Sequence, residues 1–131
     1  MKPVKESADV WSDASVQEFT EILGSVRVHP ALSKELREWA IGRGVRLTTL
    51  LRHLLIRFLD LDSEEALVEL EDVEIRELTC AVTLPPIYLT ADAKGAFDQK
   101  ADELGVERLT LWRNILEAGA KRRRPADDYL G

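Results

Sequence analysis

Hydrophobic and polar residues alternate in two short stretches of the chain, residues 25–30 and residues 86–91. Alternation with a period of two predicts a strand of about four to six residues with one buried face. The apolar positions of the two stretches are Val26, Val28, Ile87 and Leu89. We therefore expect two short strands, far apart in the sequence, that each turn two apolar side chains towards a core.

Each stretch is followed by two segments in which apolar residues recur three and four positions apart, the spacing of an amphipathic helix. The first segments, residues 32–44 and 93–105, each end at a glycine suited to a left-handed helix end. The second segments, residues 46–59 and 108–120, follow at once. The order strand, helix, helix is thus expected twice.

The two sets of elements are related by an offset of 61 residues without a gap, which marks an internal repeat. Examples of the matched positions are Val28 with Leu89, Leu36 with Phe97, Gly44 with Gly105 and Arg52 with Arg113. One strand and two short helices bury too little surface to be stable alone, so the two copies must share a core. The expected fold is mainly α with a short two-stranded antiparallel ribbon, in which residues 26–28 pair with residues 87–89 before four helices.

We call residues 25–59 the first repeat and residues 86–120 the second repeat. An additional N-terminal helix is expected within residues 1–24, because apolar residues there follow a helical pattern. These residues are Trp11, Val16, Phe19, Ile22 and Leu23.

The stretch between the repeats, residues 60–85, is an acidic linker, and residues 121–131 form a tail that is first basic and then acidic. A linker helix is expected over residues 64–71, with Ser63 at its start. Alternation at Leu78, Cys80, Val82 and Leu84 favours a further strand that ends at the following prolines.

Composition excludes several classes of protein. With 45% hydrophobic and 32% charged residues the chain has globular values, and it has neither a long apolar run nor a signal peptide, so a cytoplasmic protein with no membrane contact is expected. Cys80 is the only cysteine and is expected to be a buried small apolar residue. Together with His29 and His53 it makes no metal site, and no cofactor is expected.

The net charge of −6 argues against binding to nucleic acid, but the distribution of the charges along the chain favours such binding. Residues 25–59 carry seven Lys or Arg against Glu35 and Glu38, a sum of +5. The linker, residues 60–85, carries nine acidic residues against Arg76, a sum of −8. A basic island therefore lies in an otherwise acidic chain.

A strand, a helix, a Gly-Val turn and a second helix within about 34 residues resemble the ribbon-helix-helix family of bacterial and phage DNA-binding proteins, the Arc and MetJ type repressors. The family pattern has an inward strand residue 16 positions before the turn glycine and an arginine 8 positions after it. Val28, Gly44 and Arg52 follow it in the first repeat. Leu89, Gly105 and Arg113 follow it in the second repeat.

A covalent duplicate is similar to the tandem family members among the relaxosome accessory proteins of conjugative plasmids, and it implies a single-chain pseudo-dimer. In this family the ribbon enters the major groove of double-stranded DNA, and the strand residues between the buried ones read bases. The corresponding residues here are Ser25, Arg27, His29, Tyr88 and Thr90. Other roles stay open for two of them. Arg27 serves only to keep an exposed strand face hydrated, and Tyr88 caps the ribbon or contacts a partner protein.

The start of the second helix in each repeat suits a DNA phosphate, because its free N–H groups carry partial positive charge. The candidate phosphate contacts are Arg46, Thr48, Thr49, Arg52, Arg108, Arg113, Lys121, Arg122, Arg123 and Arg124. Glu107 opposes such a contact in the second repeat. Two alternatives stay open. Arg52 and Arg113 form salt bridges on the helix surface, and residues 121–124 form a solvated tail.

An enzyme is not expected, because the sequence shows no nucleophile with a placed base, no evident carboxylate pair and no glycine-rich phosphate loop. The expected function is sequence-specific DNA binding, as a transcriptional regulator or a conjugation accessory factor, with further self-association of the pseudo-dimer left open. The alternative is a protein-binding module, such as an antitoxin-like protein or a phage regulator, whose acidic segments hold a partner. If the acidic linker is only a solvated connector between the repeats, this alternative loses its main support.

Overall fold

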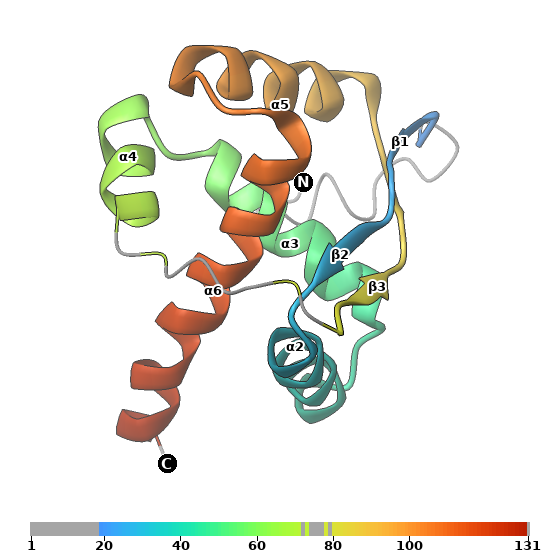
Figure 1. Cartoon of the computed structure of the whole chain (residues 1–131), viewed down its shortest axis with the longest axis vertical. Helices are drawn as coiled ribbons and strands as arrows, with labels where there is room; N and C mark the ends of the chain where they lie inside the picture. The colour runs from blue at the N-terminus through green and yellow to red at the C-terminus, as the bar shows by residue number, and fades with distance from the viewer. Residues whose placement is uncertain (1–18, 72, 74–77, 79, 131) are drawn as a thin grey trace, which may run out of the picture.

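The computed structural model describes residues 19–71, 73, 78 and 80–130, with side chains as far as Arg122. This part of the chain is mainly helical, with short antiparallel strands (Figure 1). Its elements in order are β1 Glu21–Leu23, β2 Val26–Val28, α2 Pro30–Arg43, α3 Leu47–Leu59, α4 Ser63–Glu71, β3 Val82–Leu84, β4 Ile87–Leu89, α5 Ala91–Leu104 and α6 Arg108–Leu130. The expected fold class, mainly α with a short antiparallel ribbon, is confirmed at this level.

The 61-residue repeat is visible in the order of the elements. β1, β2, α2 and α3 each begin 61 residues before β3, β4, α5 and α6, respectively. Figure 1 shows α2 and α5 at opposite ends of the molecule, with α3 and α6 crossing between them and the strands along one side. The chain therefore has a two-fold arrangement of elements without being two separate domains.

The strands pair in a register that differs from the expected one. β2 pairs with β3, in the register Val26 opposite Leu84, and β1 pairs with β4, in the register Leu23 opposite Ile87. The predicted pairing of residues 26–28 with residues 87–89 was therefore wrong. The ribbon instead has two consecutive strands on each side, because pairing extends to Glu21–Leu23 before the first repeat and to Val82–Leu84 before the second repeat.

A short break separates the two ladders at the middle of this ribbon. If the register of β1 and β4 continued, Gly24 would lie opposite Pro86 and Ser25 opposite Pro85. Proline has no N–H group to donate to a ladder, so hydrogen bonding is interrupted there. β3 ends at Leu84, directly before the prolines as expected, and the prolines lie at the centre of the ribbon.

One face of the ribbon is buried against the helices, as the alternating pattern predicts. Its buried residues are Leu23, Val26, Val28, Leu84, Ile87 and Leu89. The inward orientation of Val26, Val28, Ile87 and Leu89 is confirmed, and Leu23 and Leu84 join them because the strands are longer than expected.

Two expectations about the flanking segments were wrong. Residues 19–20 are not helical and residues 21–23 form a strand rather than the end of an N-terminal helix, while the remainder of that predicted helix lies in residues 1–18, outside the described part of the chain. Cys80 is exposed, in a turn with a left-handed φ of 58°, instead of buried. Among the described residues of the predicted third alternating stretch, residues 82–84 form a strand, and residues 74–77 and 79 lie outside the described part of the chain.

The core is shared between the repeats, as the packing of the helices shows. α2 packs against α6 as well as α3, and α3 packs against α5 as well as α6. The buried side chains of both repeats belong to a single cluster, in which Trp112, Phe58 and Phe97 are the largest. The ribbon and four helices therefore depend on one another for their stability.

The expected linker helix is α4, and it begins with a capping box. The Asp62 carboxylate accepts a hydrogen bond from the Glu65 N–H at 2.8 Å, and the Glu65 carboxylate accepts one from the Asp62 N–H at 3.1 Å. α4 packs against α5 and α6, the helices of the second repeat. On the described part of the chain, no helix has both the length and the apolar character that crossing a membrane requires.

Gly44 and Gly105 end the first helix of each repeat in the left-handed region, with φ angles of 70° and 69°. We expect Gly44→Ala and Gly105→Ala each to lower the free energy of unfolding by about 1–2 kcal/mol, because a Cβ is strained at this φ. Gly95→Ala is the control: it lies inside α5 with open space around it, and should raise stability by about 0.5–1 kcal/mol. Urea unfolding would show the opposite signs; shifts of the same sign would contradict this account of the turns.

Candidate nucleic-acid interface

The outer face of the ribbon is formed by side chains that alternate with the buried ones. Arg27 lies opposite Thr83 in one ladder, and Ile22 lies opposite Tyr88 in the other, and all four are exposed. Ser25 is exposed at the break between the ladders. Three of the predicted base-reading residues, Ser25, Arg27 and Tyr88, are therefore exposed on this ribbon.

The other two predicted base readers cap helices. The His29 imidazole Nδ1 accepts a hydrogen bond from the Ala31 N–H at 3.0 Å, at the start of α2. The Thr90 hydroxyl accepts one from the Ala93 N–H at 3.1 Å, at the equivalent position of α5. Each residue satisfies a backbone donor that the helix itself leaves unpaired. Base reading by these two residues stays a prediction.

Sequence reasoning missed two side chains of the outer face, Ile22 and Thr83. The 61-residue offset relates them, since Ile22 and Thr83 are equivalent positions of β1 and β3. Applying the 61-residue offset to residues that precede 25 and 86 would have identified both side chains. Thr83 is the more informative of the two, because its hydroxyl can both donate and accept a hydrogen bond.

Two equivalent arginines hold the ribbon on the helices. The Arg52 Nε of α3 donates a hydrogen bond to the Tyr88 carbonyl oxygen at 3.0 Å, and the Arg113 Nε of α6 donates one to the Arg27 carbonyl oxygen at 2.9 Å. Each arginine thus binds the strand of the other repeat. These bonds fix the backbone of the two residues whose side chains point outwards, Arg27 and Tyr88.

The surroundings of Arg52 support a structural role. Its guanidinium lies over the Phe19 ring, 4.9 Å from the ring centre, and partial burial lowers its pKa. Within the described residues neither Arg52 nor Arg113 forms an ion pair, so the alternative of helix-surface salt bridges was wrong. Their contact with phosphate stays a prediction.

The start of α3 is basic and open to solvent. Arg46 precedes the helix with an exposed side chain that makes no capping hydrogen bond, and Arg43 at the end of α2 is also exposed. Thr48 and Thr49 are partly buried in the first turn. Free N–H groups, the helix dipole and two guanidiniums make this turn suitable for an anion.

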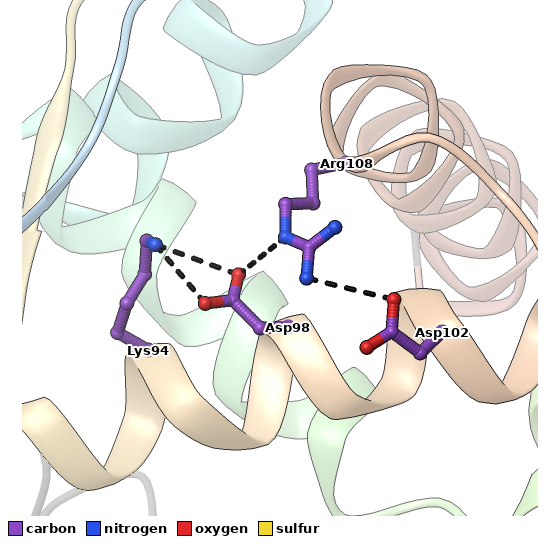
Figure 2. Close-up of polar contacts among 4 residues, drawn as sticks. All are labelled: Lys94, Asp98, Asp102 and Arg108. Carbon is purple, nitrogen blue, oxygen red and sulfur yellow. Dashed lines mark hydrogen bonds and ion pairs between the residues drawn. The ribbon is translucent and has the colours of Figure 1, made fainter.

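The start of α6 differs, because Arg108 is bound within the chain (Figure 2). Its Nε lies 2.8 Å from an Asp98 oxygen and its Nη2 lies 3.5 Å from an Asp102 oxygen. Lys94 approaches Asp98 from the other side at 3.3 Å. Hydrogen bonding to Asp98 raises the pKa of Arg108.

The charge of Asp98 is maintained in this network. Burial by itself would raise the pKa of the carboxyl, but hydrogen bonds from Arg108 and Lys94 outweigh it, and the pKa lies below its ordinary value. The predicted phosphate contact of Arg108 therefore competes with two carboxylates. This competition could not be seen from Arg108 and its sequence neighbours alone.

Equivalent positions of the repeats carry opposite charges on this side of the molecule. Arg37 and Arg46 of the first repeat correspond to Asp98 and Glu107 of the second repeat. Glu107 is exposed, and its carboxylate accepts a hydrogen bond from the Thr110 hydroxyl at 3.3 Å. The start of α3 in the first repeat is therefore more positively charged than the start of α6 in the second repeat, and it is the better suited of the two to a DNA phosphate.

The basic residues at the end of α6 are distributed differently. Arg122 pairs with Glu69 of α4 at 3.1 Å, and burial followed by repulsion from Arg57 lowers its pKa. Lys121 is exposed, while the side chains of Arg123 and Arg124 lie outside the described part of the chain. Phosphate contact by residues 121–124 stays a prediction.

Metal ligation finds no support in residues 19–71, 73, 78 and 80–130, since no three His, Cys, Asp or Glu side chains there form a group that could hold an ion. The exposed groups that remain as candidate contacts are those of the outer ribbon face and of the basic start of α3. Comparison of the chain with protein-family models, with the curated proteins and with the solved structures gives no match.

Proposed function

We propose that the chain binds double-stranded DNA through the outer face of its ribbon, as a tandem ribbon-helix-helix protein. The observation that carries the proposal is the antiparallel ribbon itself, which buries one face on four helices from two repeats and exposes Arg27, Thr83 and Tyr88 on the other. A regulator of transcription and an accessory factor of conjugation would both use this contact.

The proposed reading of bases follows from the chemistry of the exposed pairs. A two-stranded ribbon fits the major groove, which is about 12 Å wide. Arg27 would bind guanine through two hydrogen bonds, and Thr83 beside it would donate to or accept from a neighbouring base. At the other end, Ile22 and Tyr88 would contact apolar groups such as a thymine methyl. The two ends of the ribbon would thus read different bases.

The proposed phosphate contacts lie mainly in the first repeat. Arg46 at the start of α3 would neutralise a phosphate next to the major groove, whereas the equivalent start of α6 has Glu107 and an ion-paired Arg108. Electrostatic attraction would therefore be stronger on one side of the ribbon. A protein with net charge −6 can still bind DNA if its basic residues gather on the contact face.

A titration of random-sequence duplex DNA at several salt concentrations tests the proposal. We expect the logarithm of the binding constant to fall linearly with the logarithm of salt concentration. Arg46→Glu should weaken binding and reduce the slope by about one, whereas Glu107→Arg, at the equivalent position, should strengthen binding and raise the slope by about one. Binding would be followed by fluorescence anisotropy of a labelled duplex.

The two parts of the proposal fail separately. Absence of duplex binding at every salt concentration would reject DNA as the ligand and would favour a protein-binding module. Salt-dependent binding that Arg46→Glu and Glu107→Arg change in the same direction, or leave unchanged, would reject only the lopsided phosphate contact.

A further inference from the structure

Away from the ribbon, the most exposed large apolar side chains lie on α4 and at the end of α2, two places that differ in charge. On α4, Leu67 is 50% exposed and Val68 is 61% exposed, next to exposed Glu64 and Glu71. At the end of α2 and the turn after it, Ile41 and Val45 are 77% and 40% exposed. Exposed apolar groups of this size are usual at sites of protein contact.

Val45 borders a groove of about 300 Å³ formed mainly by α2 and α3. Its apolar lining includes Trp39, Leu50 and Leu54. Its basic and imidazole lining consists of Arg43, His53, Arg57 and Arg122. An occupant of this groove should therefore combine apolar side chains with carboxylates.

The equivalent face of the second repeat is covered by α4. Lys100, which is equivalent to Trp39, donates a hydrogen bond to the Leu61 carbonyl oxygen at 2.8 Å, and Ser63 bonds to Glu103 at 3.0 Å. α4 packs on α5 and α6 there. In the first repeat, α2 and α3 expose the corresponding face as the groove, so the two-fold arrangement indicates that a helix like α4 fits it.

The charges of the groove and of the outer α4 face are complementary. Arg57 and Arg122 share the single carboxylate of Glu69, at 2.8 and 3.1 Å, and Arg43 has no ion-pair partner among the described residues. The groove therefore keeps an excess of positive charge. Glu64 and Glu71 on α4 likewise have no ion-pair partner among these residues, and Leu67 and Val68 lie near them in sequence.

We propose that the outer face of α4 docks into the groove between α2 and α3 of a second copy of the chain. Arg57 lines this groove and also the hollow beside Glu64, Glu65 and Val68, so the two surfaces adjoin. Because they adjoin, a two-fold axis near Arg57 places the α4 of each molecule against the groove of the other. The result is a closed dimer in which each α4 is covered on both faces.

Sedimentation equilibrium of the full chain over a range of concentrations tests this dimer. Wild-type protein should dimerise reversibly, and the groove variant Arg43→Glu and the helix variant Glu64→Arg/Glu71→Arg should each raise the dimer dissociation constant at least about tenfold, because like charges then face each other. Lys34→Glu, an exposed reversal on α2 outside the groove, should leave the dissociation constant unchanged. Circular dichroism would verify that the variants fold.

An equimolar mixture of the groove variant and the helix variant provides the decisive comparison. In the mixed dimer one contact keeps its original charges and the other has both charges reversed, so attraction is restored in both. We expect the mixture to dimerise within about threefold of wild type. Monomeric wild-type protein at every concentration, or a mixture as weak as its two components, would overturn the proposal, and either result would leave the test of DNA binding unaffected.

Discussion

Replacing Phe97 by alanine should lower the free energy of unfolding by about 3–5 kcal/mol, the usual cost of removing a buried aromatic ring. Phe97 lies in α5 with none of its surface exposed, in the cluster to which both repeats contribute. A domain of this size has about 5–15 kcal/mol of stability in total, so the loss is a large part of it. Urea unfolding followed by circular dichroism would measure the change.

The same experiment tests whether the core is shared. Leu36 is the equivalent residue of the first repeat and is also fully buried, so Leu36→Ala should cost about 2–5 kcal/mol. Each variant should unfold in a single transition at a lower urea concentration, because neither repeat is stable without the other. Gln99→Ala, on an exposed part of α5, is the control and should change stability by less than about 0.5 kcal/mol. Two transitions, of which each variant shifts only one, would contradict the shared core.

Arg27→Ala should weaken binding to the preferred DNA sequence by about 5- to 150-fold, which corresponds to about 1–3 kcal/mol for one lost bidentate contact with a base. The preferred duplex would first be selected from a random library with wild-type protein. The fold should be preserved, because Arg113 binds the carbonyl oxygen of residue 27 and not its side chain. Anisotropy titrations at one salt concentration would give the ratio of the affinities.

Two controls distinguish the contribution of Arg27 to base recognition from the contribution of its positive charge. Lys34→Ala removes one positive charge from an exposed position of α2 and should change the affinity little. Random-sequence duplex should lose less affinity than the selected duplex when Arg27 is replaced, because base contacts do not contribute to non-specific binding. An equal loss on both duplexes would mean that Arg27 contacts phosphate only.

The repeat, the helices and the inner face of the ribbon could be predicted from the sequence, because periodicity and the turn glycines are local signals. The strand register could not. Pro85 and Pro86 follow the end of β3, as expected, but pairing resumes after them in β4, so that opposite Gly24 and Ser25 they form the centre of a longer ribbon. Pairing back to Glu21 and to Val82 accompanies the burial of Leu23 and Leu84 as well, a gain that depends on both halves of the chain at once.

The candidate site was predictable only where a side chain acts alone. Arg27 and Tyr88 are exposed as expected from their position between buried residues. Arg108 was assigned to phosphate because nothing near it in sequence shows that Asp98, ten residues earlier, lies 2.8 Å away. Cys80 was expected to be buried from the preference of its residue type, but it lies in an exposed turn.

The most direct test of the central claim is a titration of isotope-labelled protein with the selected duplex, followed by nuclear magnetic resonance of the backbone amides. The account predicts that the largest shifts occur at the outer ribbon residues Ile22, Arg27, Thr83 and Tyr88, while Leu67 and Val68 of α4 change little. Unchanged ribbon amides, with the shifts gathered on α4 or elsewhere, would contradict the claim that this ribbon binds DNA.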